Sequence, residues 1–472
     1  MSNRRRALVV AAAGTVGSRA IWFAAIPIAA RLFSPADVGA WPLVTAVPGL
    51  IAIFGTLRLD VAITVAHYTP RARVLVFAST GITLCICLIT ATAIIIFPDI
   101  IPLSAPENAS RLILFAGPLY ILFYNIGIIL QAWLLRVKAF SAIAFANASN
   151  PIVTVASLIL FAFVPGPSPQ TFVGAYLLGL VASATALGTA ALRNGLWPAA
   201  AVPSSRRVWN SIVLFRQYPF YTIPQSFTDI AGERLVQLWI AGAYSVDALG
   251  MFYLIRQILM SAMAALTAPV GQLLISDLAR VTSAVERNTL VLAFFETAAA
   301  GAGLLVGLSF VTAPTAFLLL LGSNFSAAAD YSFWLVLGLT MLLVTGWSDR
   351  LYYVLRRIDL LFSVSAAFAL LMVFIILIAW ALHLTLPTFV ALYGIAYVIW
   401  AILYLSLTMV ISDIRLFDAT IVALYHVVGI LVGAVVGAFT TAVFNELIAS
   451  LAALLMVSAI GMTLVVRLLR RI

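Results

Sequence analysis

Long apolar runs recur along this chain from Leu8 to Val466. Each run is roughly as long as the ~20 residues that a helix needs to cross the ~30 Å hydrocarbon layer of a membrane. Only 9% of the residues are charged and 64% are hydrophobic, whereas soluble domains carry roughly 25% charged residues. The runs also lack the polar alternation of a transmembrane β-barrel. The sequence therefore predicts an all-α membrane protein.

The apolar runs divide into about fourteen predicted membrane spans. These cover residues 8–30, 40–66, 74–97, 112–134, 141–163, 170–192, 212–241, 248–275, 289–312, 330–353, 360–382, 388–411, 419–443 and 446–466. The first run is longer than the apolar core of a typical signal peptide and contains Arg19, so we interpret it as a span. The longest predicted external loops, near residues 98–111 and 313–329, are too short for a catalytic domain outside the membrane.

Arginine and lysine residues gather on one side of the predicted membrane. Of the 26 basic residues, twenty lie on the side of the two termini, and only Arg31 and Arg111 lie in loops on the other side. Basic residues are retained on the cytoplasmic side of membranes, so we expect both termini in the cytoplasm. The basic residues of these loops account for the net charge of +10. Because the membrane orientation explains this charge, we expect no nucleic acid as a partner.

Two junctions between predicted spans have similar sequences. Residues 30–39 read ARLFSPADVG and residues 241–250 read AGAYSVDALG, so alanine, an aromatic residue, serine and glycine recur with an offset of 211 residues. The junctions fall on equivalent spans of two six-helix halves, as expected for an internal repeat. We therefore predict two six-helix lobes with a central cavity, followed by two C-terminal helices. The predicted parts are lobes at 1–195 and 212–415, a polar cytoplasmic linker at 196–211, and the last two helices in 416–472.

Four arginines lie inside predicted spans, namely Arg19, Arg58, Arg234 and Arg256. An ionised side chain at membrane depth costs ~2.5–3.5 kcal/mol on insertion scales, so it usually faces the protein interior or water. Guanidinium groups bind phosphate through two parallel hydrogen bonds. We therefore predict that the four arginines line a cavity and bind an anionic substrate. The alternative is that Arg58 and Arg234 each pair with an acidic residue that is close in the sequence.

Polar residues repeat at every fourth position of the seventh predicted span and form a stripe along one side of the helix. They are Gln225, Asp229, Glu233 and Gln237. Two carboxylates at this spacing suit a proton or cation coupling site, and Asp60 in the second span is a further coupling candidate. The two glutamines are predicted to line the cavity. The alternative is that the whole stripe lines a wet cavity passively.

Two segments of the chain resemble a known family. Residues 26–64 contain IPIAARLFSPADVGAWPLVTAV followed by LRLDVAIT, which resembles the amino-terminal signature of Wzx-type polysaccharide and oligosaccharide flippases. These belong to the multidrug/oligosaccharidyl-lipid/polysaccharide (MOP) exporter superfamily. Residues 244–280 resemble the second-lobe counterpart of this signature. The predicted topology agrees with that family along the whole chain.

The resemblance implies a flippase that moves an undecaprenyl-pyrophosphate-linked oligosaccharide across a bacterial cytoplasmic (inner) membrane. It implies alternating access of one site to the two sides, with ion-gradient coupling left open. Its expected partners are the lipid-linked oligosaccharide, the lipid bilayer and the polysaccharide polymerase machinery. Lipid II flippases, a related branch, carry cavity arginines on helices 1, 2 and 8, the predicted helices of Arg19, Arg58 and Arg256.

Other functions remain as alternatives. A lipid II flippase and a multidrug exporter of the MATE type share the implied architecture, but cationic drugs favour a cavity rich in carboxylates. A membrane glycosyltransferase or polymerase usually needs acidic catalytic groups or a large external loop, and the sequence shows neither. We predict no catalytic residue, cofactor or metal site, because His67, His383 and His426 are far apart and accompany no ligand-like cluster.

Overall fold

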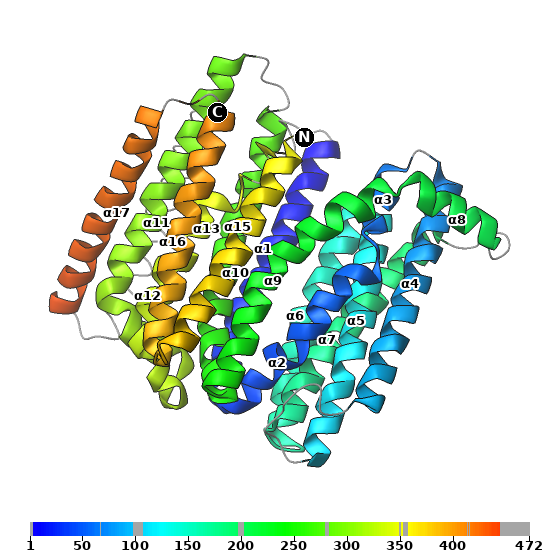
Figure 1. The fold of residues 1–472 in the computed structure, drawn as a ribbon, viewed down its shortest axis with the longest axis horizontal. Helices are drawn as coiled ribbons and strands as arrows, with labels where there is room; N and C mark the ends of the chain where they lie inside the picture. The colour runs from blue at the N-terminus through cyan, green and yellow to red at the C-terminus, as the bar shows by residue number, and fades with distance from the viewer. Residues whose placement is uncertain are drawn as a thin grey trace. The chain divides into compact units, whose positions relative to one another are not determined.

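The structure is a computed structural model that describes residues 3–66, 68–97, 107–196, 203–278, 283–348, 351–352, 357–412, 414 and 416–443. Every regular element in these ranges is helical (Figure 1). Eleven helices in the same ranges are long and apolar enough to cross a membrane. The predicted all-α membrane class is therefore confirmed. The total of about fourteen spans stays a prediction, and the last predicted span, 446–466, lies outside the described residues.

The chain packs into two compact units, Met1–Tyr253 and Leu254–Ile472, which we describe separately. The elements of the first unit are α1 (Asn3–Leu32), α2 (Pro35–Gly55), α3 (Leu59–Val65), α4 (Thr69–Ile96), α5 (Glu107–Arg136), α6 (Phe140–Phe163), α7 (Pro169–Ala191), the short π-helix η2 (Leu192–Leu196), α8 (Ser205–Leu214), α9 (Gln217–Ala243) and the start of α10 (Val246–Leu278). The lobe boundaries expected around residues 196–211 stay a prediction.

The second predicted span is broken into α2 and α3. Leu57 and Arg58 between these helices have positive φ angles of 46° and 53°, a left-handed conformation that residues other than glycine rarely adopt. The Thr56 hydroxyl donates to Asp60 Oδ1 at 2.9 Å and accepts the Arg58 amide at 3.1 Å. Such local hydrogen bonds compete with the helical ladder. The prediction of one continuous helix over residues 40–66 is therefore wrong at this point.

The two copies of the sequence repeat begin their helices in the same way. At α2, the Ser34 hydroxyl accepts the Asp37 amide at 3.2 Å. At α10, the equivalent Ser245 hydroxyl accepts the Ala248 amide at 3.0 Å. A serine at this position satisfies one of the amides that the first helical turn leaves without a partner. The serines that recur in the sequence thus have the same structural role.

The repeat glycines bring the starts of α2 and α10 into backbone contact. A Cβ atom at Gly39 would overlap the carbonyl oxygen of Val246, and one at Gly250 would overlap that of Pro35. The contact is reciprocal, because each glycine faces the first turn of the other helix. Small residues allow membrane helices to approach this closely. The glycines that recur in the sequence therefore form one shared contact.

The second unit is also helical. Its elements are the rest of α10, α11 (Ala284–Leu321), the 3₁₀ turn η3 (Ser323–Ala328), α12 (Ala329–Leu339), α13 (Met341–Thr345), α15 (Ile358–Ala381), α16 (Leu386–Ile411) and α17 (Leu416–Val443). The external loop predicted at 313–329 is wrong in its first part, because α11 continues through Pro314 to Leu321. The apolar run there has no break signal other than this proline, which membrane helices tolerate.

Glycines also hold α17 against α11 in the second unit. A Cβ atom at Gly303 would overlap the carbonyl oxygen of His426, and one at Gly307 would overlap that of Ile430. The His426 ring nitrogen Nδ1 lies 3.0 Å from the carbonyl oxygen of Ala299. This spacing of small residues is a common interface between membrane helices. The helix predicted at 419–443 is thus packed closely onto the unit.

Candidate functional site

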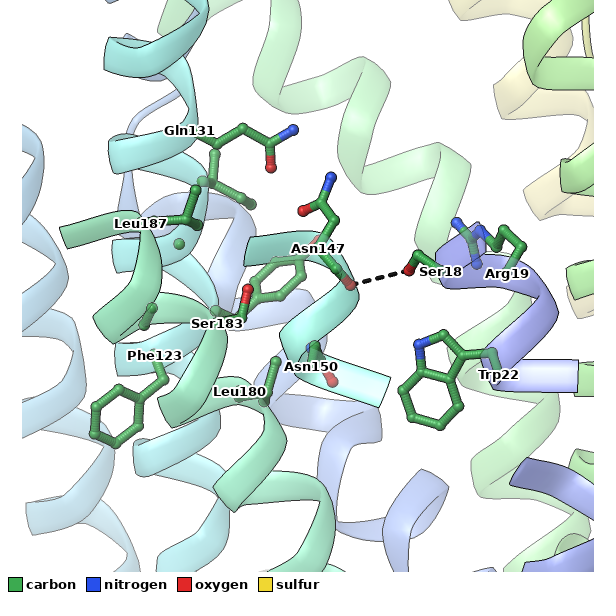
Figure 2. A pocket seen from close by; sticks show the side chains of 14 residues that line it. Ser18, Arg19, Trp22, Phe123, Gln131, Asn147, Asn150, Leu180, Ser183 and Leu187 are labelled. Carbon is green, nitrogen blue, oxygen red and sulfur yellow. Dashed lines mark hydrogen bonds between the residues drawn. The ribbon is translucent and has the colours of Figure 1, made fainter. Parts of the chain in front are cut away.

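A polar cavity of about 360 Å³ lies within the first unit, among α1, α5, α6 and α7 (Figure 2). Its lining residues are Ser18, Arg19, Trp22, Phe123, Tyr124, Gly127, Ile128, Gln131, Asn147, Asn150, Leu180, Ser183, Ala184 and Leu187. Ionised and amide side chains are costly inside membrane helices unless they face protein or water. The convergence of such side chains from α1, α5 and α6 on one cavity therefore marks a candidate binding site.

Helices α1 and α6 form one wall of this cavity. The Ser18 hydroxyl donates to the carbonyl oxygen of Asn147 at 2.9 Å, which holds α1 against α6. Figure 2 shows Ser18 and Trp22 of α1 facing Asn147 and Asn150 of α6. Asn147 and Asn150 are three residues apart and so lie on the same side of their helix. Arg19 is half-buried at the edge of this wall.

Aromatic packing fixes the position of Trp22. The Trp22 ring lies 5.4 Å from the ring of Tyr176, which in turn lies 4.8 Å from the ring of Trp41. Aromatic pairs at such distances contribute roughly 0.5–1.5 kcal/mol beyond the burial of their area. The indole of Trp22 is thus held in place at the cavity, where a flat apolar ligand face is able to stack on it.

The chemical groups of the cavity are one guanidinium, several amides and hydroxyls, and aromatic rings. Among the residues that the structure describes, no carboxylate lines this cavity. Amides and hydroxyls both donate and accept hydrogen bonds, which suits the hydroxyl groups of a sugar. A guanidinium binds phosphate with two parallel hydrogen bonds. The cavity is therefore suited to a ligand that carries both phosphate and sugar, and it is poorly suited to a cation.

Arg19 is identifiable from the sequence as a candidate site residue, whereas the amides of the cavity are not. Gln131, Asn147, Asn150 and Ser183 lie on three different apolar helices, and no motif connects them. The pair of asparagines three residues apart is the one local signal in α6. Because polar residues are expensive in membrane helices, this pair indicates a buried polar face even without the structure.

Arg58 lies beside an acidic residue, as the alternative interpretation expected. Its Nη1 atom is 3.8 Å from Asp60 Oδ2, and its side chain is 29% exposed. Asp60 is buried and also accepts the Thr56 hydroxyl. The left-handed backbone at Arg58 turns the chain between α2 and α3 at this ion pair. Asp60 is thus engaged on both of its carboxylate oxygens.

Arg234 contacts the polar stripe of α9. Its Nη1 atom donates to Gln237 Oε1 at 3.0 Å. The guanidinium also lies against Gly49 of α2, where a Cβ atom would come within 3.0 Å of Nε. Tyr124, which lines the cavity of Figure 2, is close enough to Arg234 and Arg58 to interact with them electrostatically. The first unit thus places two further arginines near one wall residue of the cavity.

The stripe residues of α9 differ in burial. Gln225 and Gln237 are buried, Glu233 is half-buried and Asp229 is exposed. The carboxylates therefore face a more open surface than the glutamines do.

Arg256 lies in the second unit, on the continuation of α10, and is 7% exposed. The structure places Arg19, Arg58 and Arg234 in one compact unit and Arg256 in the other. A shared cavity for all four arginines stays a prediction.

A bundle of apolar helices with enclosed arginines and amides is typical of membrane transporters. The chain is similar in structure to the lipid II flippase MurJ in an inward closed conformation, with a TM-score of 0.72 and 13% identity over 96% of this chain and 98% of that one. It is also similar to an inward-facing multidrug resistance MATE transporter of the MOP superfamily, with a TM-score of 0.57 and 14% identity over 85% of this chain and 95% of that one. These similarities show that the chain shares its fold with the two proteins. No family model matches the sequence, and no curated protein matches it.

Proposed function

We propose that the protein is a flippase that moves an undecaprenyl-pyrophosphate-linked oligosaccharide across the bacterial cytoplasmic membrane. The observation that carries this proposal is the cavity of Figure 2, where Arg19 accompanies amides and hydroxyls and no carboxylate is among the lining residues. In this proposal Arg19 binds the pyrophosphate, Asn147 and Asn150 bind sugar hydroxyls, and Trp22 stacks on a sugar face. Arg58, Arg234 and Arg256 are further candidates for binding the charged group.

The proposed transport cycle is alternating access, in which one site opens to each side of the membrane in turn. The distribution of basic residues supports an orientation with both termini in the cytoplasm. Polysaccharide polymerase machinery is the proposed partner that consumes the translocated substrate. Because the solved structure of MurJ is that of a lipid II flippase, lipid II is the alternative substrate, although such an analogy of fold is weaker than the chemistry of the site.

A binding measurement tests this proposal. We expect the full-length protein in detergent to bind a lipid-pyrophosphate-linked oligosaccharide more tightly than a lipid pyrophosphate without the glycan, because the amides contact the sugar. A cationic dye, the usual probe for multidrug exporters, is expected to bind weakly. Tight binding of the dye together with no binding of the lipid-linked glycan contradicts the proposal.

The carboxylates of α9 give a separate prediction about coupling. Asp229 and Glu233 are one helical turn apart, so protonation or cation binding at one relieves its repulsion with the other. The double variant Asp229→Asn, Glu233→Gln is expected to lose the acceleration of transport by an imposed proton or sodium gradient. Its rate of exchange in the absence of a gradient is expected to stay unchanged. The measurement is the initial transport rate in proteoliposomes with and without each gradient.

The matched control is Asp359→Asn. This carboxylate is exposed and pairs with Arg357 at 3.3 Å outside the stripe. Transport by the control variant is expected to respond to the gradient as the wild type does. If the α9 variant retains the full response to the gradient, the two carboxylates do not couple transport to it.

A further inference from the structure

A second cavity of about 420 Å³ opens at the surface of the first unit, between the start of α4 and α8. It is lined by Tyr68, Pro70, Arg71, Val74, Arg207, Asn210 and Ser211. The two helices pack against each other (Figure 1). Within the described part of the chain, the lining of this cavity holds two arginines and one amide and includes no carboxylate.

The positive charge of this cavity has no acidic counterpart nearby in the chain. The sequence has no Asp or Glu between residues 61 and 98 or between residues 108 and 228. Within the described part of the chain, no ion pair involves Arg71 or Arg207, and both side chains are exposed. The Arg71 guanidinium lies over the ring of Tyr68, 6.0 Å from its centroid. An anion is therefore the ligand that complements this cavity.

Neighbouring arginines differ from this pair because they bind backbone oxygens. Arg73 Nη2 donates to the carbonyl oxygen of Gly195 at 2.6 Å, and Arg136 Nη1 donates to that of Ala66. These contacts tie α4 to η2 and α5 to the end of α3. Arg71 and Arg207 are thus the arginines at this end of the unit that the cavity presents to a ligand.

Helix α8 carries apolar side chains on two sides. Val208 and Ile212 pack against the core of the unit, whereas Trp209, Val213 and Leu214 are 66%, 42% and 55% exposed. An amphipathic helix with an exposed tryptophan is typical of the membrane interface, where its apolar side enters the acyl chains. The cavity beside α8 is therefore expected at the depth of lipid head groups.

We propose that the cavity between α4 and α8 binds the head group of an anionic phospholipid of the surrounding membrane. The guanidinium groups of Arg71 and Arg207 bind the phosphate, and the Asn210 amide donates to a head-group oxygen. The exposed apolar side of α8, at Trp209 and Val213, contacts the acyl chains. This lipid is a resident ligand, so the proposal is independent of which substrate is transported.

Lipid titrations on the full-length protein in detergent test this proposal. The probes are dihexanoyl phosphatidylglycerol, dihexanoyl phosphatidylcholine and inorganic phosphate, with binding followed by native mass spectrometry. We expect phosphatidylglycerol to bind most tightly and the double variant Arg71→Ala, Arg207→Ala to weaken its binding by about thirtyfold, since each arginine near a membrane surface contributes about a factor of five.

The control variant carries Arg193→Ala and Arg216→Ala, which remove two exposed arginines of the same unit outside the cavity. Its affinity for phosphatidylglycerol is expected to stay within about twofold of the wild type, because screening limits distant charges. The variant Arg71→Lys, Arg207→Lys keeps both charges, and its affinity for phosphatidylglycerol is expected to lie between those of the wild type and the alanine variant. This variant provides a second test if the alanine variant does not fold. Equal binding of both phospholipids, equal competition by inorganic phosphate, or wild-type affinity for phosphatidylglycerol in a folded alanine variant overturns the proposal.

Discussion

Replacing Arg19 by alanine is expected to slow translocation of a lipid-pyrophosphate-linked oligosaccharide by about tenfold or more. A hydrogen bond to a charged group is worth roughly 1.5–3 kcal/mol, and each 1.4 kcal/mol is about a factor of ten in affinity. Among the described residues that line the cavity of Figure 2, Arg19 is the one cation, so its loss removes the group that is proposed to bind phosphate there. The measurement is the rate of leaflet exchange of a fluorescent substrate in proteoliposomes.

Two variants separate charge from folding in this experiment. Arg19→Lys keeps the charge but loses the planar fork, so we expect a rate between those of the wild type and the alanine variant. Arg193→Ala removes an exposed arginine of η2 outside the cavity and is expected to transport at the wild-type rate. If Arg19→Ala is folded and transports as fast as the wild type, Arg19 does not bind the substrate.

Replacing Gly250 by alanine is expected to destabilise the first unit by about 1–3 kcal/mol, the usual cost of forcing a methyl group into a packed site. The added Cβ would overlap the carbonyl oxygen of Pro35, which belongs to the backbone of α2 and moves only with that helix. Gly39→Ala is expected to have a similar effect, because its Cβ would overlap the backbone of α10. The measurement is the midpoint of thermal unfolding of the full-length protein in detergent.

Gly242 offers a matched control on α9. A Cβ atom there would meet no atom within 4 Å, and alanine is a better helix former than glycine by roughly 1 kcal/mol. Gly242→Ala is therefore expected to leave the melting temperature unchanged or to raise it. The double variant of Gly39 and Gly250 is expected to be less destabilised than the sum of the single variants, since both disturb one contact. Unchanged stability of Gly250→Ala means that the two helices do not depend on this contact.

The helical class could be predicted from the sequence because a chain that crosses a membrane must satisfy its backbone hydrogen bonds internally, which only helices and closed barrels do. Helices α6, α7 and α16 lie within a few residues of their predicted spans, where apolar runs are bounded by proline or charged residues. The repeat was visible because its serines and glycines have fixed roles. Ser34 and Ser245 cap helices, and Gly39 and Gly250 allow close contact.

Other features depend on contacts that a span prediction does not include. The break at Leu57 and Arg58 depends on the hydrogen bonds that Thr56 makes with Asp60 and Arg58. In the sequence, no glycine or proline at these positions marks the break. The cavity of Figure 2 combines polar residues that are isolated in the sequence, since Asn147 and Gln131 meet only after α5 and α6 have packed. Arg19 was identifiable because its charge alone makes it exceptional in a membrane span.

Arg58 and Arg19 have different surroundings in the first unit. Its ion pair with Asp60 and the bond from Thr56 to Asp60 give this arginine a local structural role at the break between α2 and α3. Arg19 lines a cavity with amides instead. We therefore consider Arg19 the stronger candidate for binding the substrate.

Leaflet exchange by the purified wild-type protein is the most direct test of the proposed function. Proteoliposomes receive a fluorescent lipid-pyrophosphate-linked oligosaccharide on one leaflet, and a membrane-impermeant quencher reports its arrival on the other. We expect exchange that depends on the protein, returns the substrate chemically unchanged, and slows with Arg19→Ala but not with Arg193→Ala. Exchange no faster than in protein-free liposomes, or a product with a lengthened or transferred glycan, would contradict the account.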